Sequence, residues 1–240
     1  MATGRRGASG RLTTLLVLIA AVSPLLVLVA ALGARFGVLT PDLAWRVLTW
    51  QAAWVMAFVG AAAALAAAVT ALRDWKRRGL TAMMAVAIAG ATLGGFLYQQ
   101  HRAADPAPFD LSSDVADVPA FSAAVDRQRR ADGAVEVQVH GGPQDCHGLR
   151  TVRRQVAPGV AAWALQQAGF TPLGAAAFRA NGRREGFWYG FVYDAEVRIR
   201  PGQTDVHVAA RYADADGGEA CRLAVRLVEA LDTQPGQAGR

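Results

Sequence analysis

The sequence predicts three N-terminal transmembrane α-helices followed by an extracytoplasmic α+β domain with an antiparallel sheet. Three observations support this prediction. The first 100 residues contain three long segments without charge, the connections between them differ in positive charge, and the rest of the chain alternates between strand-like and helix-like hydrophobic patterns. With 53% hydrophobic residues and a mean hydropathy of +0.21, the 240-residue chain is also too apolar to be one soluble domain.

A membrane anchor is predicted over residues 1–102, with helices at about residues 12–34, 47–72 and 79–100. Each of these segments lacks charged residues and is at least 22 residues long, and a helix of about 20 residues crosses the hydrocarbon core of a bilayer. The polar residues within them are mainly Ser, Thr and Gln. Transport usually requires ionisable groups at membrane depth, so the sequence favours an anchor over a channel or pump.

Positive charge beside the spans predicts the topology. Seven cations lie before the first span and in the second connection, "RDWKRRG", whereas the first connection and the end of the third span together hold Arg35, Arg46 and Arg102. Lys and Arg near a span resist translocation. We therefore expect a bacterial inner (plasma) membrane protein whose N-terminus and RDWKRRG connection are cytoplasmic and whose C-terminal domain is extracytoplasmic.

The first span is predicted to remain as an anchor rather than to be cleaved as a signal peptide. Its 23 apolar residues exceed the roughly 7–15 residues of a usual signal-peptide core, although residues 31–33 form an acceptable cleavage sequence. In the third span, Gly90 and Gly94 form a GxxxG pattern that allows close approach of helix backbones. This pattern favours packing among the three helices of one chain, with homodimerisation as the alternative.

The pI of about 10.1 suggests nucleic-acid binding, but the distribution of charge argues against it. Residues 1–100 carry eight Arg and one Lys against two acidic residues, a net charge of +7, and residues 101–240 carry 16 Arg against 17 acidic residues, a net charge of −1. A phosphate-binding surface needs clustered cations on the domain itself. No nucleic-acid partner is therefore predicted.

The α+β domain is predicted over residues 109–231, between a linker at 103–108 and a flexible tail at 232–240. Its first segment, "FDLSSDVADVPAF" (109–121), is rich in Asp and Ser and is expected to form turns and to dock on the core as an arm. Expected helices follow at 122–130, from Pro158 to a C-terminal glycine at 169, and at 219–231. Expected strands are at 135–139, 149–157, 172–178, 186–193 and in "DAEVRIRPGQTDVHVAARY".

That last segment predicts a hairpin with alternating apolar and charged residues. A two-residue Gly202-Gln203 turn would place Arg200 opposite Asp205, Arg198 opposite His207 and Asp194 opposite Arg211. Its charged side is expected to be either a solvated or loosely covered sheet surface or a ligand groove with an anion-binding wall. The residues of this candidate binding face are Asp194, Glu196, Arg198, His207, Arg211 and Asp216.

Both cysteines, Cys146 and Cys221, lie in the C-terminal domain, and outside the cytoplasm such a pair predicts a disulfide; two unpaired thiols are the alternative. Cys146 and His147 are adjacent and His140 lies six residues earlier, which raises the possibility of a metal site or a cysteine nucleophile. Adjacent side chains rarely point at one centre, and the sequence lacks CxxC and HxxxH spacings. We therefore predict no metal site and no cofactor, and no catalytic residue is assigned.

The arm resembles the opening segment of the domain of unknown function 1499 family, and the matching residues are Asp110, Ser112, Asp114 and Phe121. "GFVYDAEVRIRPGQTDVHVAARYADADGG" is similar to that family's central and closing segments at Asp194, Arg198, Arg211, Asp216, Gly218 and Arg222. Ala210, Ala213 and Ala220 replace serine, glycine and asparagine, which are usual there. The resemblance covers about residues 109–231 and implies the membrane-anchored architecture without implying an activity.

These features favour a non-enzymatic binding or scaffold module in the cell envelope. The expected partners are the lipid bilayer, an envelope lipid, glycan or protein ligand, and a second copy of the chain through Gly90 and Gly94. The alternative is an envelope hydrolase that uses the polar sheet face around Asp194, Glu196 and His207, since paired carboxylates can serve as acid and base.

Overall fold

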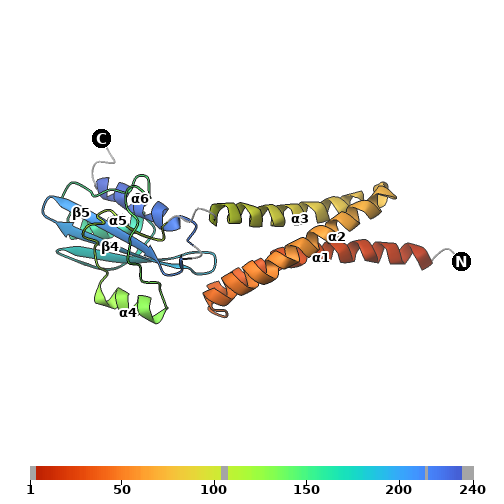
Figure 1. Ribbon diagram of the computed structural model, residues 1–240, viewed down its shortest axis with the longest axis horizontal. Helices are drawn as coiled ribbons and strands as arrows, with labels where there is room; N and C mark the ends of the chain where they lie inside the picture. The colour runs from red at the N-terminus through yellow and green to blue at the C-terminus, as the bar shows by residue number, and fades with distance from the viewer. Residues whose placement is uncertain (1–3, 104–107, 214–215, 234–240) are drawn as a thin grey trace. The chain divides into compact units, whose positions relative to one another are not determined.

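The computed structural model describes residues 4–103, 108–213 and 216–233, which divide into two compact units (Figure 1). One unit contains the N-terminal helices together with Trp188–Gly190, and the other is the C-terminal domain. Most of the predicted linker (residues 104–107) and of the predicted tail (residues 234–240) lies outside the described residues.

Three helical segments of the N-terminal unit are long and apolar enough to cross a membrane, which supports the predicted membrane protein. They comprise α1 (Gly4–Arg35), a π-helix η1 (Leu43–Ala53) that continues directly into α2 (Trp54–Leu72), and α3 (Trp75–Ala103). The candidate spans run from Thr13 to Arg35, from Leu43 to Leu72 and from Trp75 to His101. The structure thus extends the second and third predicted spans at their N-terminal ends.

Small side chains bring the three helices together. One buried cluster of this unit consists of alanines from α1, α2 and α3: Ala20, Ala64, Ala67, Ala71, Ala82, Ala85 and Ala89. Gly60 of α2 approaches α1 so closely that an added Cβ would lie 3.2 Å from the Cα of Ala20. A Cβ added to Gly90 or Gly94 would meet no atom within 4 Å. The expectation that the GxxxG pattern packs within the chain is therefore wrong, because alanines make those contacts instead.

The C-terminal domain is an antiparallel five-stranded sheet with helices on both faces, which confirms the predicted fold class. The sheet order is β1-β5-β4-β3-β2, and α5 and α6 lie on the face opposite α4 (Figure 1). The elements are, in chain order, β1 (Asp110–Ser112), α4 (Ala123–Ala131), α5 (Pro158–Gln167), β2 (Thr171–Ala176), β3 (Arg179–Glu185), β4 (Val192–Arg200), β5 (Gln203–Ala210) and α6 (Glu219–Asp232).

The main hydrophobic core lies between the sheet and helices α5 and α6. The inward side of β4 contributes Ala195, Val197 and Ile199, and α6 contributes leucines including Leu223 and Leu227, all buried. Because strand side chains alternate between faces, the charged residues of β4 and β5 point to the opposite side. The sheet therefore has one apolar face and one polar face, as the alternation predicted.

Three expected strands are wrong in the structure. Residues 135–139 form no strand. Val139 is 85% exposed, so the alternating pattern of this segment does not correspond to burial against a core. Residues 149–157 make only an isolated bridge between Val152 and Thr204. Residues 186–191 connect β3, "RANGRRE", to β4. The composition of β3 is unfavourable for a strand, but cross-strand pairing with the carboxylates of β4 compensates.

The β4–β5 hairpin differs from the predicted register by two residues. Arg198 pairs with Asp205, Glu196 with His207, and Arg200 with Gln203, so the loop is Pro201-Gly202 rather than Gly202-Gln203. Proline suits the first central position of a turn, and Gly202 takes the positive φ of 77° that the second position of a type II turn requires. A shift of two residues keeps every side chain on its predicted face.

The predicted disulfide joins Cys146 to Cys221, with the two Cα atoms 5.6 Å apart. Cys146 lies in the connection between α4 and α5, and Cys221 lies in the first turn of α6. The bridge therefore attaches a segment without regular secondary structure to the helix that covers the core. This same segment contains His140, which is part of the site described next.

Candidate functional site

The polar face of the sheet lies beneath other parts of the domain. Asp194, Glu196 and His207 are 0%, 1% and 3% exposed, so the solvated or loosely covered surface that the sequence allowed is wrong. The arm and α4 cover this face, and Phe121 at the end of the arm stacks on the His207 ring with the centroids 4.3 Å apart. The predicted ligand groove stays a prediction, and Arg198, with 21% of its side chain exposed, is the most exposed residue of the predicted binding face.

Asp194 is the centre of one ion-pair cluster on this face. Its carboxylate accepts two hydrogen bonds from Arg211, at 2.7 and 2.8 Å, and one from Arg129 of α4, at 3.2 Å. Arg183 of β3 approaches it at 3.5 Å. Burial lowers the pKa of Arg211, but the hydrogen bonds and negative charge of Asp194 and then Asp132 outweigh burial and raise that pKa above its ordinary value.

Glu196 has a single described ion pair, in which Arg179 donates to it at 2.7 Å. Burial raises the pKa of the Glu196 carboxyl, and the hydrogen bond and charge of Arg179 offset this effect only in part. Arg179 also donates to the carbonyl oxygen of Ala120 in the arm, so the same guanidinium connects sheet and arm. Glu196 therefore keeps a raised pKa despite its ion pair with Arg179.

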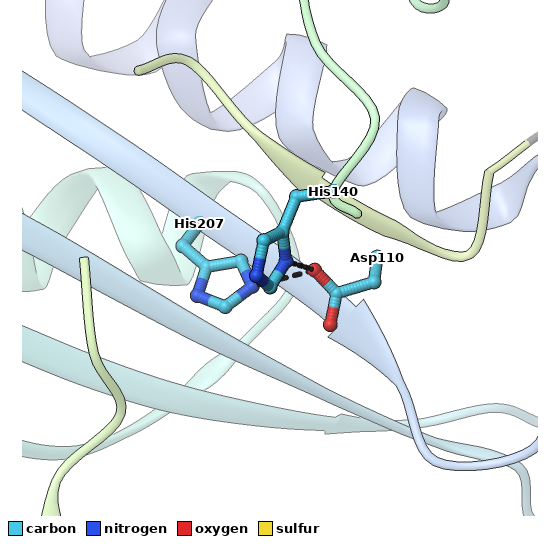
Figure 2. Close-up of side chains that lie close together, drawn as sticks. All are labelled: Asp110, His140 and His207. Atoms are coloured by element: carbon cyan, nitrogen blue, oxygen red, sulfur yellow. Dashed lines mark hydrogen bonds and ion pairs between the residues drawn. The ribbon is translucent and has the colours of Figure 1, made fainter. Parts of the chain in front are cut away.

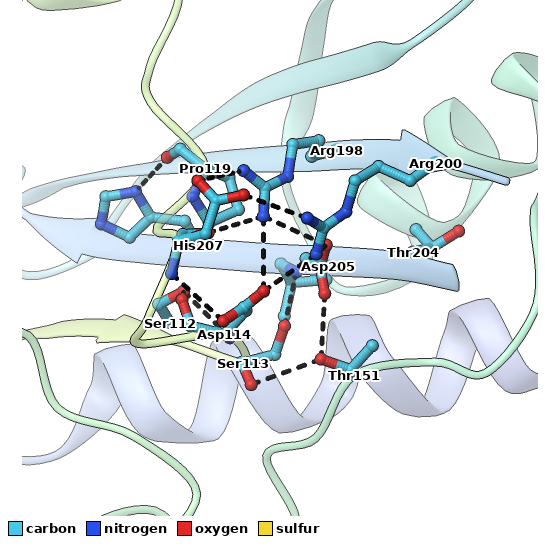
Figure 3. Close-up of polar contacts among 12 residues, drawn as sticks. Ser112, Ser113, Asp114, Pro119, Thr151, Arg198, Arg200, Thr204, Asp205 and His207 are labelled. Carbon is cyan, nitrogen blue, oxygen red and sulfur yellow. Dashed lines mark hydrogen bonds and ion pairs between the residues drawn. The ribbon is translucent and has the colours of Figure 1, made fainter. Parts of the chain in front are cut away.

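A second ion-pair cluster fastens the arm to the hairpin (Figure 3). Arg198 and Arg200 lie side by side, with the carboxylates of Asp114 and Asp205 directed toward them. Arg200 contacts Asp114 at 2.8 Å and Asp205 at 2.6 Å. The Thr151 hydroxyl donates to Asp205 at 2.9 Å. Asp114 of the arm therefore has ion-pair partners on the hairpin.

Asp110, His140 and His207 form a third polar cluster (Figure 2). Asp110 Oδ1 lies 2.5 Å from His140 Nδ1 and 2.8 Å from His207 Nε2. Burial favours the protonated form of Asp110, but hydrogen bonds and charge from His207 and then His140 outweigh it and hold the Asp110 pKa below its usual range. The side chains of Asp110 and His207 are 6% and 4% exposed, whereas that of His140 is 26% exposed. The cluster thus reaches the surface at His140.

Asp216, the last residue of the predicted face, lies elsewhere. Its carboxylate accepts hydrogen bonds from the backbone N–H groups of Gly218 and Ala220, at 2.8 and 2.9 Å, at the start of α6. Burial raises the pKa of Asp216 to about 6, although these hydrogen bonds oppose the shift. Its role is therefore to satisfy the N-terminus of α6, and the structure does not bring it to Asp194.

Sequence reasoning missed several residues that complete these clusters. Arg129 lies on α4, which covers β4, and Arg179 lies on β3, which pairs with β4. No spacing rule in the sequence predicts either position. The sequence groups His140 with Cys146 and His147, but Cys146 is in the disulfide, and His140 instead contacts Asp110 together with His207, which lies 67 residues later on β5. In the sequence, Asp110 stands out only through the resemblance of the arm, and that resemblance does not indicate its partners.

Chemically, the polar face is dominated by charge pairs within the chain. The described contacts of Asp194, Asp205 and Arg211 are to oppositely charged or polar groups, and the disulfide removes Cys146 as a nucleophile. Such pairing stabilises a buried charge that would otherwise be costly. No protein-family model, curated protein or solved structure matches this chain.

Proposed function

We propose that the protein is a membrane-anchored binding or scaffold module whose C-terminal domain acts in the cell envelope without catalysing a reaction. The observation that carries this proposal is the internal pairing of the polar face. Asp194 and Arg211, both at most 3% exposed, pair with each other, and Asp194 also holds Arg129 of α4. Arg198 and Arg200 hold the arm against the sheet. These charges stabilise the fold, and we therefore expect a ligand to bind at the surface of the domain.

The surface that we propose for binding is the arm–loop edge, which we define as the exposed apolar residues of the arm and of the segment after α4. Val115, Val135 and Val139 are 46%, 51% and 85% exposed. The arm and this segment lie together, because a Cβ on Gly142 would lie 2.8 Å from Val115 and Leu111 bridges to Gly141. Exposed apolar groups on a supported surface are typical of binding sites.

Photocrosslinking in native membranes tests this proposal. A photoreactive amino acid replaces Val115 or Val139 in the full chain, and in a control it replaces Arg226, an exposed residue of α6. We expect a discrete adduct at Val115 and Val139 that is absent at Arg226. Mass spectrometry of the adduct then distinguishes a lipid, a glycan and a protein ligand. Equal labelling at all three positions, or none at any, contradicts the proposal.

The envelope location and the topology belong to this proposal. Three helices capable of crossing a membrane and a disulfide in the C-terminal domain support them, since disulfides persist in oxidising compartments outside the cytoplasm. The proposed arrangement has the N-terminus in the cytoplasm of a bacterial cell and the C-terminal domain outside the inner membrane. Membership of the domain of unknown function 1499 family is proposed on the same arm and hairpin residues.

An envelope hydrolase is the second candidate, and one observation favours it. Glu196 is a buried carboxylate whose pKa is raised, and such groups can act as general acids. If the domain is a hydrolase, the full chain should cleave members of a panel of ester, amide and glycoside substrates. Turnover should be lost in Glu196→Gln and retained in Glu185→Gln, which changes an exposed residue of β3. Equal turnover in both variants excludes this role for Glu196.

A further inference from the structure

The cluster of Asp110, His140 and His207 has the composition of a transition-metal site. Its three ligand atoms, one oxygen and two ring nitrogens, all lie within 4.8 Å of one another. Zn²⁺ binds such atoms at about 2.0–2.2 Å, which corresponds to a separation of about 3.3 Å between neighbouring ligand atoms in a tetrahedral site. The present separations of 2.5 and 2.8 Å from Asp110 Oδ1 need to widen by less than 1 Å.

The hydrogen bonds of His207 orient one nitrogen toward this centre. His207 Nδ1 lies 2.7 Å from the carbonyl oxygen of Pro119, which can only accept, so Nδ1 carries the proton. In the neutral ring Nε2 then carries a lone pair instead of a proton, and this nitrogen lies 2.8 Å from Asp110 Oδ1. Two acceptors at this distance need a positive charge between them, either a second ring proton or a metal ion. A histidine that donates its other N–H to a backbone carbonyl is typical of metal ligands.

The fold holds the three ligands in place without the ion. Asp110 on β1 and His207 on β5 occupy adjacent paired strands. The backbone of Gly141, next to His140, donates to the Asp110 carbonyl and accepts from Ser112 N–H, both at 2.9 Å. A side chain at Gly141 would clash, because its Cβ would lie 2.5 Å from Pro108. This glycine therefore permits the close approach that brings His140 to Asp110.

We propose that Asp110, His140 and His207 form a binding site for a divalent transition ion of the zinc class. Two imidazoles and one carboxylate suit Zn²⁺ and its first-row neighbours rather than Ca²⁺ or Mg²⁺, which prefer all-oxygen sites. The partly exposed His140 provides the entry path that a metal site requires. The ion would join the arm, the segment after α4 and the sheet, and this proposal is independent of which ligand the arm–loop edge binds.

Metal binding is measured on the full chain, purified in detergent with a histidine-free affinity tag and freed of metal by chelation. Titration calorimetry with Zn²⁺ gives stoichiometry and affinity, and Co²⁺ is the spectroscopic probe because its visible absorption increases strongly on leaving octahedral water for a low-coordinate site. The test variant is His140→Asn, whose amide can replace Nδ1–H as a donor to Asp110 but removes the imidazole. The matched control is His147→Ala, an exposed histidine of the same segment.

We expect one Zn²⁺ per chain in the wild type and in His147→Ala, a higher midpoint of thermal unfolding with Zn²⁺, and visible Co²⁺ bands. In His140→Asn the affinity should fall at least tenfold and the bands should disappear, while circular dichroism shows the wild-type fold. No binding by the folded wild type, or unchanged binding in His140→Asn, overturns the proposal. Loss of binding in His147→Ala instead would assign the metal to a different site and overturn it as well.

Discussion

Asp194 illustrates at the residue scale how the polar face stabilises the domain. It is fully buried and contacts Arg129, Arg183 and Arg211. Replacing Asp194 with Ala leaves these guanidinium groups without their common counter-charge. Because removing one partner of a buried pair costs about 3–5 kcal/mol, Asp194→Ala should lower the free energy of unfolding by that amount. Denaturant unfolding of the full chain in detergent measures the change. Glu136→Ala, at an exposed position, should change it by less than about 0.5 kcal/mol.

Asp216 predicts a dependence of stability on pH. Its pKa is about 6 in the folded protein against 3.8 for the free side chain, so between these values the folded state binds more protons than the unfolded state. The contribution of Asp216 is therefore fully present below pH about 4 and is lost as the pH rises to about 6. At roughly 1.4 kcal/mol per pKa unit the loss is about 3 kcal/mol.

Asp216→Asn tests this dependence because it removes the titration and keeps one oxygen that can accept backbone hydrogen bonds. The difference in free energy of unfolding between wild type and Asp216→Asn should shift by up to about 3 kcal/mol against the wild type between pH 4 and pH 7. Burial also raises the pKa of Glu196, and this contribution has the same sign and cancels in the difference. A constant difference over this range contradicts the assigned pKa.

The sequence revealed which residues of the polar face share a side but not their partners. Alternation in "DAEVRIR" was sufficient to place Asp194, Glu196 and Arg198 together. Their partners Arg129, Arg179 and Arg183 depend on how α4 and β3 pack, and long-range packing leaves no periodic signal in one sequence. The Asp110–His140–His207 cluster was missed for the same reason, since its members are 30 and 67 residues apart.

At the scale of elements, the disulfide connects the segment that contains His140 to α6. It closes a loop of 75 residues, for which the chain-entropy treatment gives a stabilisation of about 4 kcal/mol. The double replacement Cys146→Ser/Cys221→Ser should therefore lower the free energy of unfolding by about that amount. Comparing the oxidised wild type, the reduced wild type and the double variant by denaturant unfolding checks this, and the reduced wild type should resemble the variant. A change below about 1 kcal/mol would contradict the prediction.

The glycines of the membrane helices should respond differently to substitution. A side chain at Gly60 meets the backbone of α1 near Ala20, whereas side chains at Gly90 and Gly94 meet nothing within 4 Å. Gly60→Leu should therefore lower the thermal midpoint of the full chain in detergent, and Gly90→Leu/Gly94→Leu should leave it close to the wild-type value. If the chain forms the homodimer through α3 that the sequence analysis gave as the alternative, the double variant alone should lose intermolecular crosslinks in membranes.

Elements were predictable where a local rule determines them. Pro158 and Gly169 delimit α5 as expected, with Gly169 at a positive φ of 88°. The predicted hairpin register is wrong by two residues because Pro201 and Gly202, rather than Gly202 and Gln203, form the turn. β3 was not predicted because Gly, Asn, Ala and Glu, which it contains, are depleted in strands, and its formation depends on neighbours on both sides.

At the scale of the whole molecule, the proposed topology can be tested with reporter fusions. Fusions at Thr40 and Arg240 should activate a reporter that requires export, and a fusion at Gly79 should activate one that requires the cytoplasm. The reason is the excess of Lys and Arg before the first span and between the second and third. Activity measured in intact cells checks each position. A cytoplasmic signal at Arg240 would place the C-terminal domain inside the cell and remove the envelope proposal.

The position of β1 has a mechanical consequence. This three-residue strand is the first element after α3 and lies at the edge of the sheet, paired only with β5 among the described strands. A pull transmitted along the chain from the third helix would therefore reach the domain first at β1. Peeling it away would lift the arm from Arg198 and Arg200 and part Asp110 from its two histidines. Release of β1 would thereby uncover charges that are buried in the folded domain.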